Sequence, residues 1–122
     1  MDILSVNSRI QSLEISLSEA KRKSFSLEMK LEEVKKAIDF LEFQAKKEFV
    51  FDTTLKNAEQ REIKAQEALL EKQSYQESKE LLCNLKREIF DSQEVERNIK
   101  SEVDSYKRIF QVLLNQFAKV EA

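Results

Sequence analysis

The chain has 122 residues and contains no Gly, no Pro, no His and no Trp. Gly supplies the backbone conformations with positive φ that tight turns use, and Pro marks turns and helix ends. Their absence argues against sandwiches, barrels, nucleotide-binding α/β folds and other folds that depend on specialised loops. The formal net charge is −2 and both halves of the chain are balanced, which leaves no basic segment to neutralise the phosphates of a nucleic acid. The charged content of 36% is typical of a coiled coil or a long helix.

Residues 3–41 carry apolar side chains with the alternating three- and four-residue spacing of a heptad repeat. The a and d positions of this first seam are Ile3, Val6, Ile10, Leu13, Leu17, Ala20, Ser24, Leu27, Leu31, Val34, Ile38 and Leu41. The series is longer than the three or four heptads that indicate a coiled coil, and its period predicts a left-handed supercoil. Ser24 is its one polar residue: either it sets the register of the helices, or the seam tolerates a small side chain.

A second seam, out of phase with the first, follows in the last third of the chain. Its a and d positions are Leu82, Leu85, Ile89, Ser92, Glu96, Ile99, Val103, Tyr106, Phe110, Leu113, Phe117 and Val120. Glu96 stands at an a position, where a buried carboxylate without a partner is costly. We therefore expect Val95 to take the core position there and Glu96 to turn outward.

Further apolar residues widen the second seam. Leu81, Val95 and Ile109 occupy g positions, and Leu114 occupies an e position. A face that includes a, d and g positions is broader than a two-stranded seam and favours contact with several helices. We expect the C-terminal segment to be the part that forms a bundle.

The seams divide the chain into a coiled-coil segment (1–44), a helical segment with a weak seam (45–81) and a coiled-coil or bundle segment (82–122). In the middle segment the series Leu41, Ala45, Phe49 forms a stutter. Because no Gly or Pro marks a turn, we expect one continuous helix through this segment. The alternative is a turn at 51–54 or 74–77, where residues suited to helix N-caps lie. The fold class is all-α: a long helical coiled coil or, if the chain turns, a helical hairpin or antiparallel bundle.

Large apolar residues also lie away from the first seam. Phe40 and Phe43 stand at outer c and f positions, close in sequence to two further phenylalanines, and Phe25 and Met29 lie on a similar side. Either a helix of the same assembly covers this face, or a separate partner binds it. The candidate residues for partner binding are Phe25, Met29, Phe40, Phe43, Phe49 and Phe51.

The residue types that catalysis needs are scarce. Without His, the commonest general base and metal ligand is missing, and without Gly no phosphate-binding loop can form. Cys83 is the only cysteine and has no imidazole to activate it. We expect a non-enzymatic protein, and we assign no catalytic, metal-binding or cofactor-binding residue and no small-molecule substrate.

The sequence also bears on location. The N-terminus has neither the basic region nor the apolar run of a secretory signal, and no apolar stretch approaches the ~20 residues of a membrane span. A single cysteine fits a reducing compartment. We expect an intracellular protein, cytoplasmic or nuclear, without a membrane span.

The two heptad series resemble those of coiled-coil subunits in cytoskeletal, centrosomal, kinetochore or meiotic chromosome assemblies. This resemblance implies a structural scaffold subunit that links or spaces partners, and that oligomerises through both seams with itself or with another coiled-coil protein. The alternative is a helical hairpin or bundle that acts as an adaptor, chaperone or regulator. Such a module would bind its partner through the aromatic patch at Phe40, Phe43, Phe49 and Phe51.

Overall fold

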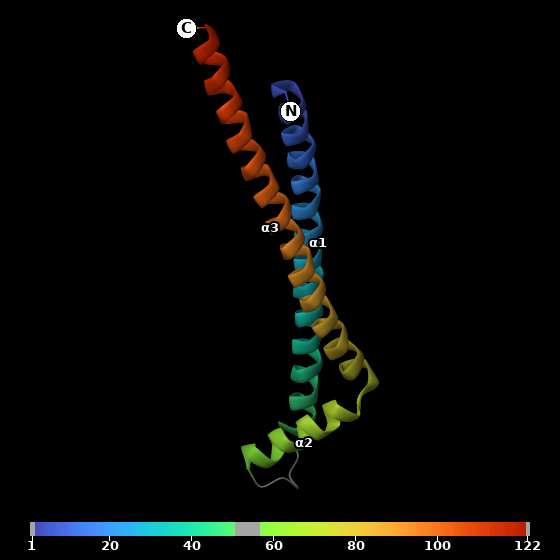
Figure 1. The fold of residues 1–122 in the computed structure, drawn as a ribbon. Helices are drawn as coiled ribbons and strands as arrows, with labels where there is room; N and C mark the ends of the chain where they lie inside the picture. The colour runs from blue at the N-terminus through green and yellow to red at the C-terminus, as the bar shows by residue number, and fades with distance from the viewer. Residues whose placement is uncertain (1, 51–56, 122) are drawn as a thin grey trace. The chain divides into compact units, whose positions relative to one another are not determined.

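The computed structural model describes residues 2–50 and 57–121, and the side chains of 2–50 and 57–119. This part of the chain forms three helices, α1 (Ile3–Val50), α2 (Ala58–Glu71) and α3 (Gln73–Glu121), and no strand (Figure 1). The predicted all-α fold class is confirmed.

Polar caps define the helix ends. The Asp2 carboxylate accepts the backbone N–H of Ser5 at 2.7 Å where α1 begins. At the start of α2, the side chain of Asn57 accepts the N–H of Gln60 at 2.8 Å. Each cap satisfies one of the backbone donors that a helix N-terminus leaves without an intrahelical partner.

The prediction of one continuous helix through residues 45–81 is wrong. Helix α1 ends at Val50, and the backbone of Lys72 is extended (φ −78°, ψ 120°), which separates α2 from α3. The turn considered at 51–54 lies outside the described residues. The one considered at 74–77 is close to the observed break, but α3 already begins at Gln73.

The described chain divides into two compact units, one formed by Met1–Ser26 with Ile89–Ala122 and one formed by Leu27–Glu88. In the first unit, α1 and α3 lie side by side (Figure 1). Arg9 pairs with Glu102, and Ser24 with Ser92, so that residue numbers rise on one helix as they fall on the other. The two helices are therefore antiparallel within this unit.

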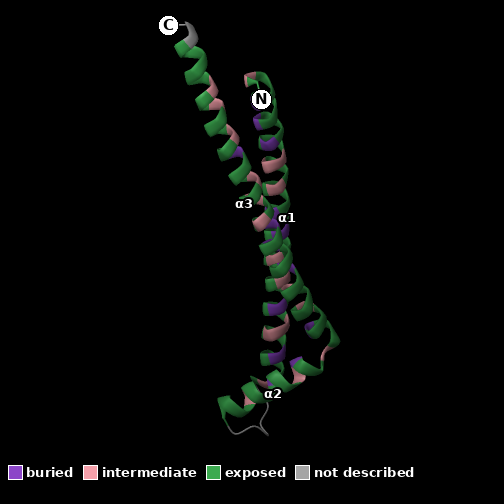
Figure 2. Cartoon of the chain, viewed as in Figure 1, coloured by how far each residue is buried: buried purple, intermediate pink, exposed green. Residues whose placement is uncertain are grey.

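The core of the first unit is formed by the seam residues (Figure 2). The buried side chains are Val6, Ile10, Leu13 and Ser24 on α1, and Ile89, Ser92 and Val103 on α3. Burying one Leu, Ile or Val stabilises a fold by about 1.5–3 kcal/mol, so these contacts supply the main attraction between the helices.

Within the unit formed by Leu27–Glu88, all three helices contribute to the core. Its buried residues are Ile38, Ala45, Ala65, Leu69 and Tyr75, with Val34, Leu41, Phe49 and Leu82 packed around them. The small side chains of Ala45 and Ala65 let α1 and α2 approach closely. Phe49 is half-buried while Glu48 is exposed, so the seam side of α1 continues through Ala45 to Phe49.

Most of the predicted seam positions are shielded from solvent. All twelve positions of the first seam are buried or half-buried, and so are those of the second seam from Leu82 to Leu113. Phe117 differs, with 59% of its surface exposed. Phe117 lines an open hollow together with Ile3 at the start of α1, which leaves much of its ring uncovered. The side chain of Val120 lies outside the described residues.

The prediction that Val95 takes the core position and Glu96 turns outward is wrong. Val95 is 50% exposed, whereas Glu96 is half-buried at its seam position. The heptad register continues without interruption from Ser92 to Ile99, so the backbone keeps Glu96 at the seam. A long side chain can bury its methylene groups there while its carboxylate reaches water.

Candidate interaction surface

The aromatic residues singled out from the sequence fall into separate environments. Phe40 and Phe43 are 58% and 63% exposed, and Met29 is 51% exposed. Phe49 instead packs against the core of its unit. Phe25 is 64% exposed but belongs to the other unit, and Phe51 lies outside the described residues.

Four exposed apolar residues share one side of α1 within the unit Leu27–Glu88. They are Met29, Phe40, Phe43 and Val50, and we call them the outer face of α1. Their successive spacings of eleven, three and seven residues each approximate a whole number of turns at about 3.6 residues per turn. Val50 was not among the candidates, although its f position, shared with Met29 and Phe43, could have identified it.

The outer face stays uncovered because the helices of this chain pack against the opposite, seam side of α1. The seam side of this part of α1 contributes Ile38 and Ala45 to the core, and packs against α2 and α3. The c and f positions point away from that core, so none of the described helices covers Phe40 or Phe43. Large apolar side chains grouped on a surface mark an interaction site more often than scattered single ones do.

Charged residues of both signs border the outer face. Glu32 and Glu33 lie towards the N-terminal end of this part of α1, and Lys46 and Lys47 lie towards its C-terminal end. All four are exposed, and the Glu32 carboxylate lies 3.7 Å from the ammonium of Lys35 on the same helix. Lys30 and Lys36 are exposed beside these acids, and Glu48 beside these lysines, so charges of both signs flank the outer face along its length.

A hollow of about 320 Å³ adjoins the C-terminal end of the outer face. Lys46 and Val50 of α1 and Ala58, Arg61 and Glu62 of α2 line it. It mixes apolar surface with both signs of charge and opens beside Val50. This is a place where an apolar side chain of a partner could be accommodated.

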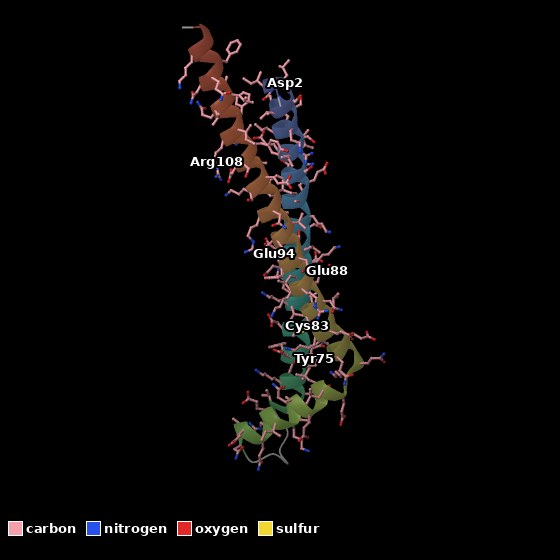
Figure 3. All side chains as sticks on the ribbon, viewed as in Figure 1. Asp2, Tyr75, Cys83, Glu88, Glu94 and Arg108 are labelled. Atoms are coloured by element: carbon pink, nitrogen blue, oxygen red, sulfur yellow. The ribbon has the colours of Figure 1, made fainter. Side chains whose placement is uncertain are left out.

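Tyr75 fixes α3 to α1 in the same unit (Figure 3). Its side chain is 7% exposed, and its hydroxyl donates to the Glu42 carboxylate at 3.2 Å. The ammonium of Lys79 lies 5.5 Å from the centre of the ring. These contacts hold the start of α3 against the seam side of α1.

Two pairs of seam-flanking charges connect α1 and α3. Arg9 lies 3.6 Å from Glu102, and Glu14 lies 3.4 Å from Lys107, in the unit that contains both helix ends. These are g–g and e–e pairs, the flanking pairs that antiparallel heptads bring together. Exposed pairs of this kind contribute about 0.2–1 kcal/mol each.

Comparison with protein-family models, with curated proteins and with solved structures gives no match. Across residues 2–50 and 57–121, no helix has both the length and the apolar character needed to cross a membrane.

Proposed function

We propose that this chain is a non-enzymatic protein–protein interaction module that binds a helical partner through the outer face of α1. The observation that carries the proposal is the exposure of Phe40 and Phe43, each by more than half, on a helix whose seam side is occupied by its own chain. An amphipathic partner helix would cover these rings with its apolar side and meet the flanking charges with its polar side.

The proposal is tested with the paired substitution Phe40→Ser and Phe43→Ser. Because both side chains are exposed, the variant should keep its helical circular dichroism and its melting temperature. Proteins cross-linked to the wild-type chain in cells should be lost from the variant. The matched control is Phe90→Ser, which removes a ring that is also 58% exposed but lies on α3 in the other unit. Partners that the double variant retains would contradict the proposal.

A second candidate is a scaffold subunit that assembles through the unit containing both helix ends. It is favoured by the exposed apolar residues beside the second seam, Val95 (50%) and Ile109 (39%), with Leu114 (37%) nearby. These residues would pack against helices of another coiled-coil protein and so widen the seam into a bundle. Val95→Ser with Ile109→Ser should then lower the assembly mass in light scattering, and an unchanged mass would contradict this candidate.

We also propose an intracellular location, cytoplasmic or nuclear. The support is Cys83, the single cysteine of the sequence, whose thiol is free and exposed. An exposed unpaired thiol is best preserved in a reducing compartment. Microscopy of the tagged chain in its own cells tests this, and a secreted product would contradict it.

A further inference from the structure

We draw no further inference here: the strongest candidate, the open hollow of about 300 Å³ that Ile3 of α1 and Leu113 and Phe117 of α3 line in the unit containing both helix ends, carries nothing because nothing in the structure shows what covers it.

Discussion

The hydroxyl oxygens of Ser24 and Ser92 lie 2.7 Å apart inside the antiparallel seam, and each side chain is only 5% exposed. Each hydroxyl thereby gives the other the hydrogen-bond partner that a buried polar group needs. If α3 slipped by one heptad, Ser24 would face Leu85 or Ile99, and both hydroxyls would be left unpaired. This pair favours the register-setting interpretation of Ser24 over that of a tolerated small residue.

Single substitutions in this pair should therefore cost more than the double one. Ser24→Ala or Ser92→Ala leaves one buried hydroxyl unsatisfied, and each should lower the free energy of unfolding by about 1–3 kcal/mol. The double alanine variant removes both polar groups and should be more stable than the sum of the single effects indicates. Urea unfolding followed by circular dichroism gives the double-mutant cycle. Additive effects would show that the two hydroxyls do not depend on one another.

Tyr75 should contribute more through its ring than through its hydroxyl. Tyr75→Ala opens a cavity among Ala65, Leu69 and Leu82, and should cost about 3–5 kcal/mol. Tyr75→Phe keeps the ring and loses only the hydrogen bond to Glu42, so it should cost about 0.5–1.5 kcal/mol. Thermal unfolding of both variants checks the order. The loss of stability caused by Glu42→Ala should be smaller in the Tyr75→Phe background. An equal loss in both backgrounds would show that the Tyr75–Glu42 hydrogen bond does not contribute to stability.

The heptad seams could be predicted from the sequence because helical periodicity is a local property. Each side chain from Ile3 to Leu41 repeats at the spacing that places it on one face, whatever helix then covers that face. The exposure of Phe40 and Phe43 follows from the same geometry, since c and f positions lie opposite the seam. What no local pattern specifies is that the covering helix belongs to the same chain.

The break at Lys72 is the clearest example of a feature that local sequence does not determine. Gln, Lys and Glu around it favour helix, and neither Gly nor Pro interrupts them. The extended conformation at Lys72 lets Leu69 and Tyr75 enter one core from two helices. Tertiary burial outweighs helix propensity here. By contrast, Asn57 with Gln60 at the third helical position is a cap signal that sequence inspection could have found.

The first turn of α1 should depend on pH through Asp2. The pKa of this carboxyl is lowered, chiefly because its ionised form accepts the backbone N–H of Ser5. A lowered folded-state pKa means that the cap is fully formed above the ordinary value of about 3.9, and that it is lost as the pH falls through the folded value. In an NMR titration, the Ser5 amide and the Asp2 carboxyl should change together, below the pH at which an unstructured Asp titrates.

The control for the Asp2 titration is Asp2→Ala, in which the pH dependence of the Ser5 amide shift should disappear. Because Asp2 is fully exposed, the change should be confined to the first turn and leave the rest of α1 unaltered. An Asp2 carboxyl that titrates at the ordinary value would contradict the cap.

The antiparallel pairing of α1 with α3 predicts a short distance between residues far apart in the sequence. Ser12 and Asp104 have numbers that add up to 116, as those of Ser24 and Ser92 do, and both are exposed. Spin labels on cysteines at these positions, in a Cys83→Ser background, should lie roughly 15–25 Å apart, since packed helices have axes about 8–10 Å apart. A single continuous helix would separate them by about 138 Å at ~1.5 Å per residue.

Two controls complete the distance measurement. Labels at Ser12 and Ser26 on α1 should give about 21 Å in any helical state, at ~1.5 Å per residue, and so calibrate the method. Dilution with unlabelled chain should leave the Ser12–Asp104 distance intact, because the pairing is within one chain. A coupling that disappears on dilution would instead assign the pairing to two different chains, and the seams would then be an oligomer interface.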